Sequence, residues 1–489
     1  MSTFGVTKYG AGVYGVADAN SNLIWGLEIA WSGTYNGDNE AMRMVDCTVR
    51  RGRSDWVSDD GFQPFDQGEA VCILENDDER YWALNTSSPL YPYVRPGPFA
   101  RLYVIDGRGG TTYPIMRGYV EDIECYTQDG SRFARVILKH SQDWLKDKTA
   151  SVATTTTEWI DEVMYDLLDD ADWPWAEWTD ELAGNTTALI YFYWQRQTAP
   201  LAELRALAAT QPNILYCNRV GSIRFMGYQY TYDNEVAITS DTMLADLTLL
   251  QPWRSLRNRA RVYAYPPATK NITATLWALA DATLIPAGQT LTFIPTLEYN
   301  DYTFVGPASA ITWDLTVNTQ ADGGGSDITS SCTTESKPGG SEVVVYNGNA
   351  SNGYITKLEA DVTGNVYVAP NDPSIPESNS TASQALYGVR LLTWDSQWLQ
   401  AASEAASMAT WLVGQLSGLQ VEPEIQIETR PSLQFAGDLF VTRVDLDVLD
   451  IDAYFRIGHI THEWLSETGQ AVRTTWKLEP YLTPWVPPA

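Results

Sequence analysis

The densest group of side chains that could perform chemistry lies between Glu158 and Glu181, where acidic residues alternate with tryptophans. A glycosidase needs one protonated and one ionised carboxyl group at the same sugar, and indole rings offer flat faces for sugars to stack on. No lysine or arginine occurs from Ser151 to Gln195. The alternative is a solvated acidic helix face whose tryptophans pack on a neighbour, and charge runs favour this interpretation because they usually form exposed faces.

Other chemical motifs lack the context that their chemistry requires. Gly10–Gly15 fits a dinucleotide-binding pattern, but no predicted strand precedes it and no amphipathic helix follows to face a pyrophosphate. His459 and His462 fall in a predicted strand, so their imidazoles point to opposite faces and cannot readily share a metal. The sequence therefore predicts no catalytic residue, no metal and no cofactor, and we do not expect an enzyme.

Charge and cysteine usage narrow the class of protein further. The 61 acidic and 32 basic residues give a net charge of −29, which disfavours tight binding to nucleic acid or to anionic membranes. Five widely spaced cysteines without a Cys-x-x-Cys pair indicate buried free thiols and synthesis in a reducing cytosol. We find no signal peptide and no apolar run of about 18 residues, the length of a membrane-spanning helix.

The elements that position these residues are predicted to be mainly strands. Aromatic residues make up 12% of the chain, and they suit the half-buried pleated surfaces of sheets. With 489 residues, the chain should contain several domains. The predicted fold class is therefore mainly β (α+β) and multidomain.

Turn signals between Arg50 and Ile123 are the most specific part of the sequence. An Arg-Gly-Arg turn follows Arg50, and an alternating strand at 70–74 then ends at Asn76-Asp77-Asp78, whose side chains can bond their own backbone. A proline-rich loop leads to the strand Tyr-Pro-Ile-Met-Arg-Gly-Tyr-Val-Glu-Asp-Ile. The Asp-Gly pair at 129–130 predicts a tight hairpin.

This order of turns resembles the N-terminal domain of siphophage minor tail proteins that form the tail-tip hub. Those proteins carry an Arg-Gly-Arg turn, a strand followed by Asn-x-Asp-x-Arg-Tyr, and a Gly-Tyr-Val-Glu-Asp-Ile strand, and residues 50–53, 76–81 and 118–123 match these motifs. The spacing of Leu247, Trp253, Asn258, Arg259 and Val262 resembles the entry to a second tube-like domain in the same proteins.

The resemblance implies a structural virion protein at the distal end of the phage tail, made in the host cytoplasm. It implies a homotrimer that forms a pseudo-sixfold ring and contacts the distal tail protein ring, the C-terminus of the tape-measure protein and the tail-fibre or tip proteins. DNA would only pass through the lumen. The competing hypothesis is a carbohydrate-binding protein or glycosidase that uses residues 158–181. The candidate interface residues are Arg50, Arg51, Arg53, Asn76, Asp78, Arg80 and Tyr81.

Composition and periodicity divide the chain into four regions. Residues 271–356 contain only one basic residue, Lys337, and alternate strands with Gly-rich turns, as in a β-sandwich inserted between proline-rich boundaries. Two apolar stripes at helical spacing are Ile160, Val163, Met164, Leu167 and Leu168, and Trp398, Ala402, Ala405, Ala409, Leu412 and Leu416. The predicted domains are 1–150 (first tube-like domain), 151–235 (small α/β domain), 236–266 with 386–489 (second tube-like domain) and 267–385 (β-sandwich insertion).

Overall fold

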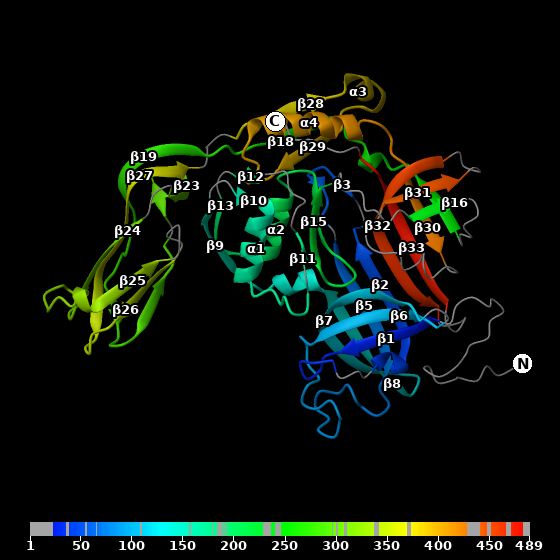
Figure 1. The fold of residues 1–489 in the computed structure, drawn as a ribbon, viewed down its shortest axis with the longest axis horizontal. Coiled ribbons are helices and arrows are strands. Elements are labelled where there is room, and N and C mark those ends of the chain that lie inside the picture. The colour runs from blue at the N-terminus through cyan, green and yellow to red at the C-terminus, as the bar shows by residue number, and fades with distance from the viewer. Residues whose placement is uncertain are drawn as a thin grey trace, which may run out of the picture.

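The fold is mainly β and multidomain, as predicted (Figure 1). In Figure 1 a narrow module extends to the left of a larger body. The computed structural model describes residues 23–482 apart from 36–38, 54–55, 65, 108–109, 156–157, 179, 183–188, 191–192, 228–235, 240–245, 296, 300–301, 308–310, 337–341, 369–372, 428–440, 447–450 and 466–470.

The largest sheet begins with strands from the N-terminal part of the chain, in the spatial order β1-β6-β7-β8-β5-β2. Alternate residues of β6 face the core, so Ala100, Leu102 and Val104 are buried while their neighbours are partly exposed. We call this part the N-terminal half of the sheet. Its strands are β1 (Leu23–Ile29), β2 (Met44–Gly52), β5 (Asp66–Glu75), β6 (Phe99–Asp106), β7 (Thr112–Gln128) and β8 (Ser131–His140).

A tight turn joins the long strands β7 and β8. Asp129 and Gly130 both have positive φ angles, 51° and 86°, and Gln128 pairs with Ser131 across the turn. Positive φ at both central positions matches the right-handed twist of the two strands. The predicted hairpin is therefore confirmed.

The outer edge of β1 is partly closed by the side-chain amide of Asn39. The backbone N–H of Leu27 donates to Asn39 Oδ1 at 2.9 Å, and Asn39 Nδ2 donates to the Trp25 carbonyl at 3.2 Å. Asn39 also begins the short 3₁₀ helix η1 (Glu40–Arg43). Because these edge groups are occupied, another strand cannot pair with the middle of β1.

The same sheet continues into strands from the C-terminal part of the chain, so the blue and red strands of Figure 1 lie side by side. Residues Thr48–Gly52 of β2 pair antiparallel with His459–Glu463 of β32. Strands of the two predicted tube-like domains thus form one continuous sheet. The strands of this C-terminal half are β16 (Val236–Thr239), β17 (Asp246–Leu250), β30 (Glu422–Ile427), β31 (Val441–Leu446), β32 (Ile451–Leu465) and β33 (Ala471–Pro480).

A smaller α/β unit follows the N-terminal half. Every member of the predicted stripe from Ile160 to Leu168 is buried on α1, so this helix stands as predicted. A second helix, α2, begins at Pro200. The elements of this unit are η2 (Ser141–Leu145), β9 (Ala150–Thr155), β10 (Glu158–Trp159), α1 (Ile160–Asp170), β11 (Asp180–Glu181), β12 (Leu189–Ile190), β13 (Tyr193–Thr198), α2 (Pro200–Ala208), β14 (Asn213–Cys217) and β15 (Ile223–Gly227).

A second small sheet, in the order β28-β18-β29, packs on α4 at the top of Figure 1. The C-terminal helix starts at Ala402, four residues after Trp398, the first residue of the predicted stripe, and no side chain caps its start. The elements of this region are β3 (Val57–Ser58), β4 (Gly61–Phe62), η3 (Trp253–Ser255), β18 (Arg259–Tyr263), β28 (Glu377–Asn379), α3 (Thr381–Tyr387), β29 (Leu391–Asp395) and α4 (Ala402–Leu416).

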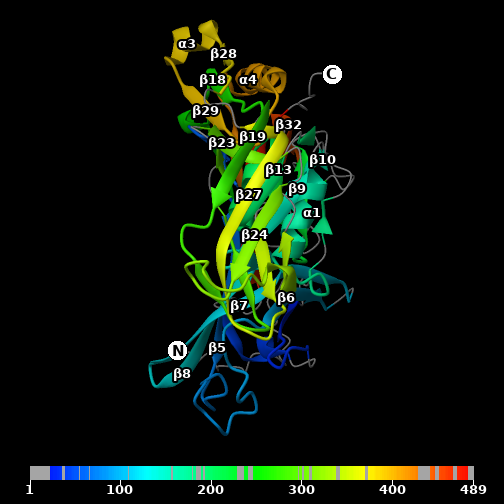
Figure 2. The ribbon, with the colours of Figure 1, turned by 90° about the vertical axis from the view of Figure 1, so that its left-hand side faces the viewer.

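The narrow module contains the strands between Ala268 and Val368 and faces the viewer in Figure 2. Its two ends meet, because the backbones of Ala264 and Ser374 exchange two hydrogen bonds of 2.9 Å. None of the helices in the described part of the chain is long and apolar enough to cross a membrane. The module consists of β19 (Ala268–Ala278), β20 (Thr283–Ile285), β21 (Thr290–Phe293), β22 (Glu298–Tyr299), β23 (Tyr302–Pro307), β24 (Thr312–Asn318), η4 (Thr329–Ser331), β25 (Cys332–Ser336), β26 (Val343–Asn347) and β27 (Gly353–Val368).

Candidate functional site

The Arg-Gly-Arg turn at the end of β2 lies where three parts of the chain meet. Arg50 is exposed on β2, whereas Arg51 and Arg53 are buried. Arg53 contacts the C-terminal half of the sheet, and Arg51 lies close to Arg219 of the small α/β unit. The turn therefore connects the N-terminal half to both of its neighbours.

Arg53 forms a buried, two-pronged ion pair with Glu479 of β33. Its Nε donates to Glu479 Oε1 at 2.7 Å and its Nη2 to Oε2 at 2.6 Å, while Nη1 donates to the Gln63 carbonyl at 2.6 Å. Such fork-to-fork geometry fixes orientation as well as adding energy. The carboxylate that Arg53 contacts belongs to the same chain, although the sequence predicts Arg53 as an interface residue.

Two glycines allow the close approach that this ion pair needs. A Cβ atom on Gly458, which lies in β32 between Arg53 and Glu479, would be 2.0 Å from Glu479 Oε1. Gly52 has a φ of 109°, and a Cβ there would be 2.2 Å from the Gly458 carbonyl oxygen. The Gly in Arg-Gly-Arg is thus required by both backbone conformation and space.

The second buried arginine, Arg51, lies among histidines. Burial, followed by the charge of Arg219, lowers the pKa of its guanidinium to about 9. A Cβ atom on Gly68 would be 2.8 Å from the His140 ring and 3.3 Å from Arg51 Cγ, so Gly68 makes room for both side chains. Burial, with Arg51 as the second cause, lowers the pKa of His140 to about 3.

The candidate residues Asn76 and Tyr81 stabilise the long loop that follows β5. Asn76 is buried and its Oδ1 accepts the Tyr81 backbone N–H at 3.0 Å. The Tyr81 hydroxyl donates to Glu40 Oε2 at 2.5 Å, and Trp31 Nε1 donates to Glu40 Oε1 at 3.1 Å. Burial, followed by the Glu40 charge, raises the pKa of Tyr81, so its hydroxyl remains a donor. These contacts fix the loop from inside the chain.

Asp78 lies on the outside of the same loop, whereas the Arg80 side chain is largely buried. Asp78 accepts two hydrogen bonds of 2.9 Å from Arg43, and the Asp78 side chain is half exposed. Arg80 donates to Glu40 at 3.1 Å. Of the candidate interface residues, Arg50 and Asp78 have the accessibility that contact with another subunit requires, whereas Arg53 and Tyr81 are buried by their own chain.

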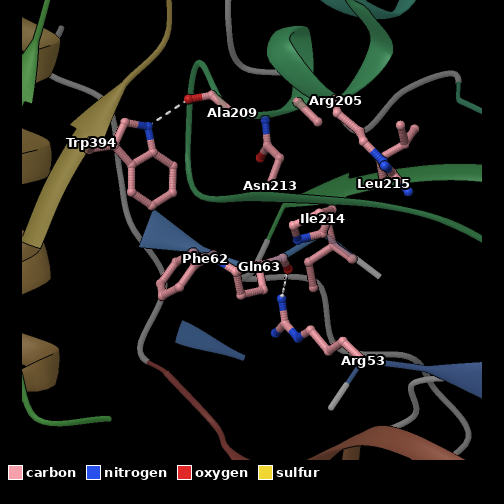
Figure 3. A pocket seen from close by; sticks show the side chains of 11 residues that line it. Arg53, Phe62, Gln63, Arg205, Ala209, Asn213, Ile214, Leu215 and Trp394 are labelled. Atoms are coloured by element: carbon pink, nitrogen blue, oxygen red, sulfur yellow. Dashed lines mark hydrogen bonds between the residues drawn. The ribbon is translucent and has the colours of Figure 1, made fainter. Parts of the chain in front are cut away.

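A cavity of about 130 Å³ adjoins the Arg53 ion pair (Figure 3). Arg53 and Phe62 line it from the N-terminal side, Ile214 from the small α/β unit and Trp394 from β29. Trp394 Nε1 donates to the Ala209 carbonyl at 2.6 Å. No carboxylate, histidine or thiol lines this cavity, so its described walls offer no general acid or base.

The tryptophans of the acidic segment are mostly part of the hydrophobic core. Trp173 and Trp178 are buried and pack against each other with ring centroids 5.2 Å apart. Trp175 donates its indole N–H to Asp169 at 2.8 Å. Buried rings cannot stack on a sugar, so the strongest sequence argument for a carbohydrate site applies to core residues. The side chains of Asp180 and Glu181 lie outside the described part of the structure.

Sequence reasoning missed Glu40, Glu479 and Gly458, which complete the network around the candidate residues. Glu40 had a detectable signal, because an acidic residue following Asn39 fits the first turn of a capped helix. Glu479 and Gly458 gave no local signal, since they lie more than 400 residues from Arg53. The dinucleotide-like motif at Gly10–Gly15 lies outside the described residues.

Comparison of the whole chain with solved structures finds tail proteins. A 43 kDa tail protein of prophage MuSo2 from Shewanella oneidensis matches with 11% identity and a TM-score of 0.49, over 94% of this chain and 99% of that protein. A tail protein from Neisseria meningitidis matches with 10% identity and a TM-score of 0.49, over 93% of this chain and 96% of that one. A prophage tail protein from Listeria monocytogenes matches with 8% identity and a TM-score of 0.43, over 93% and 94%.

At such TM-scores and identities the likeness does not assign an activity or an assembly to this chain. No protein-family model matches the sequence, and no curated protein is significantly similar to it.

Proposed function

We propose that this chain is a structural subunit of a phage tail, specifically the hub at the tip of a long-tailed phage. The observation that carries the proposal is the continuous sheet in which the N-terminal and C-terminal strands join through β2 and β32. A tube needs identical or equivalent walls around its axis. One chain that supplies two adjoining blocks of antiparallel strands supplies two such walls.

Three copies then form a ring with threefold symmetry and six wall segments. Such a ring fits a hexameric distal tail ring on one side and a threefold tip or fibre on the other. The two tube-like domains of each chain are 1–150 and 236–266 with 386–489. Within the second domain, the strands at 236–250 and 422–480 form the wall. Residues 151–235 and the insertion 267–385 lie outside the wall.

The Arg53–Glu479 ion pair supports this arrangement because it fixes the angle between the two blocks of strands. A ring closes only if each chain holds its two wall segments in one relative orientation. The buried fork, the Gly52–Gly458 contact and the β2–β32 pairing all act at that junction.

The acidic composition also suits a DNA passage. Walls rich in lysine and arginine would bind phosphates by releasing counterions and would slow DNA exit. With 61 acidic and 32 basic residues, the lumen should be acidic or neutral. The proposed role is not enzymatic, and the proposed neighbours are the distal tail protein, the tape-measure protein and the tip or fibre proteins.

Sedimentation equilibrium and electron microscopy of the purified chain test the proposal. We expect a trimer whose class averages show a ring with three protruding insertions and a sixfold-like wall. A chain that stays monomeric at about 100 μM, or a ring of another order, would contradict it. Incubation with cell-wall glycans tests the carbohydrate hypothesis, and binding or cleavage of these glycans would favour that hypothesis over a hub.

A further inference from the structure

An exposed surface that combines aromatic, apolar and basic side chains lies on η3, α3 and the segment before β29. We call it the Trp253 surface, and it consists of Trp253, Arg254, Leu386, Val389 and Arg390. Trp253, Leu386 and Val389 are 53%, 75% and 59% exposed, and both arginines are exposed beside them. Clustered exposed apolar side chains mark interaction sites, and tryptophan and arginine are both enriched at binding hot spots.

The surface is held in a fixed conformation by the buried amide of Asn258. Its Nδ2 donates to the Gly388 carbonyl at 2.8 Å and to Ser383 at 3.2 Å, and its Oδ1 accepts the Arg390 backbone N–H at 2.8 Å. The Arg390 guanidinium lies 5.9 Å from the centroid of the Trp253 ring. A surface ordered before binding loses little conformational entropy on binding.

The charge of this surface is opposite to that of the chain as a whole. Arg254, Arg257, Arg259 and Arg261 follow one another within eight residues, and Arg390 lies close enough to Arg257 to lower the pKa of that guanidinium, after the effect of burial. Asp59 pairs with Arg257, and Glu377 pairs with Arg259 and Arg261. A protein with a net charge of −29 thus displays a basic aromatic surface at one place, and an acidic partner surface is complementary to it.

The chain also carries a surface with the complementary chemistry on the outer face of α1. We call it the α1 acidic face, and it consists of Glu162, Asp166, Asp169 and Asp170, all exposed, with the 43% exposed Trp159 at its start. A hydrogen bond with Glu158 raises the pKa of Glu162. Burial, then the charges of Asp169 and Glu162, raise the pKa of Asp166. These shifts indicate crowded negative charges, which a cationic partner would stabilise.

The two surfaces lie on different sides of one molecule. In Figure 2 α3 is at the upper left and α1 on the right, and in Figure 1 α3 is at the top and α1 near the centre. They cannot therefore meet within one copy. We infer that the Trp253 surface of one copy binds the α1 acidic face of the next copy. Such a head-to-tail contact closes into a ring when it is repeated by rotation, so the inference rests on the proposed trimer and names the surfaces that join its subunits.

Charge reversal in the full-length chain tests this contact by sedimentation equilibrium. Arg390→Glu and Glu162→Lys should each raise the concentration for half-maximal trimer formation at least about tenfold, because each places like charges face to face. The double variant should recover part of that loss, since it restores opposite charges. Arg95→Glu, at an exposed arginine on the loop after β5, is the matched control and should leave assembly unchanged.

The outcomes separate this inference from the proposed function. A trimer that is insensitive to both reversals leaves the ring standing and overturns the contact. Sensitivity to Arg390→Glu alone, without rescue by Glu162→Lys, shows that the Trp253 surface meets another acidic surface and overturns the role of α1. A wild-type chain that remains monomeric at about 100 μM overturns the ring and the contact together. Circular dichroism of each variant identifies any loss of folding.

Discussion

The two halves of the large sheet reach the same pleated structure from different chain arrangements. The N-terminal half comes from one continuous segment, 23–140, and its core includes Trp31, Tyr81 and Leu90 from its own connections. The C-terminal half combines strands at 236–250 with strands at 422–480, separated by the small sheet and the insertion. The N-terminal half therefore builds most of its core from one segment, with Val472 and Trp464 added from the C-terminal half, whereas the C-terminal half requires closure of a long loop.

This difference gives β2 and Arg53 a second role. The strand β2 offers a completed edge on which β32 pairs, and Arg53 holds β33 through Glu479. Pairing strands that are far apart in the sequence costs much chain entropy before the strands gain contacts. An edge strand that is already folded, such as β2, therefore favours this pairing. We infer that the C-terminal half depends on the N-terminal half for its stability more than the reverse, and the following experiments test that asymmetry.

The largest effect is expected from Glu479→Ala. It leaves the buried Arg53 guanidinium without its carboxylate, which should lower the free energy of unfolding by about 3–5 kcal/mol. Hydrogen exchange should become faster in β32 and β33 before it does in β7 and β8. Urea unfolding with mass-spectrometric exchange measures both.

The control for that experiment is Asp78→Ala, which breaks the half-exposed pair with Arg43 and should cost only about 0–1 kcal/mol. The double variant Arg53→Met with Glu479→Leu removes both charges and should recover most of the stability. Equal loss of protection in the two halves after Glu479→Ala would contradict the proposed dependence.

Mild acid should weaken the C-terminal half more than the N-terminal half. Burial lowers the pKa of His459 to about 4 and also lowers that of His462, both on β32, below the value of about 6.5 expected in the unfolded chain. The unfolded state then binds more protons below pH 6.5, so stability falls from pH 6.5 towards pH 4, by up to about 1.4 kcal/mol per pH unit for each histidine.

The N-terminal side contains an opposing pair. His140 has its pKa lowered to about 3, but burial raises the pKa of Asp143 to about 6, above its usual range. Protonation of Asp143 in the folded state stabilises the fold as the pH falls from about 6 to 4, and so offsets the effect of His140. Hydrogen exchange measured between pH 6.5 and 5 should accelerate mainly in β32. The variant Asp143→Asn should remove the stabilisation that offsets His140, so that exchange in the N-terminal half also becomes faster in mild acid. An N-terminal half that loosens first in the wild type would refute this account.

Tyr81→Phe should have a smaller and more local effect. It removes the hydroxyl that donates to Glu40, while Trp31 and Arg80 still contact that carboxylate, so the cost should be about 1–2 kcal/mol. Proteolysis should then cut the loop between β5 and β6 faster, without change in the C-terminal half. Tyr91→Phe, at a half-exposed tyrosine of the same loop, is the control and should be neutral. Faster cleavage in both variants would show that the Glu40 network does not fix the loop.

The features that short-range patterns determine could be predicted from the sequence. The Asp129-Gly130 hairpin and the stripe on α1 depend on neighbours within a few residues, and both stand as predicted. The sequence does not predict the partners of the strand 259–263, β28 and β29, because tertiary packing selects which strands pair. Arg53 was recognisable as a turn residue, yet its partner lies 426 residues away, and no local pattern encodes that contact.

The smallest effect is expected from removing the insertion, which interrupts only the C-terminal part of the chain. The backbone bridge between Ala264 and Ser374 brings its two ends together, so residues 267–372 can be replaced by a Gly-Gly link while β28 is kept on β18. The free energy of unfolding of the remainder should change by less than about 1 kcal/mol, since loop-closure entropy varies only slowly with loop length. The excised module has its own buried residues, such as Val345 and Leu358, and should unfold cooperatively when expressed alone. If the deletion instead weakens protection in β32 and β33, the insertion is part of what holds the C-terminal half, and the asymmetry between the halves does not come from the N-terminal edge alone.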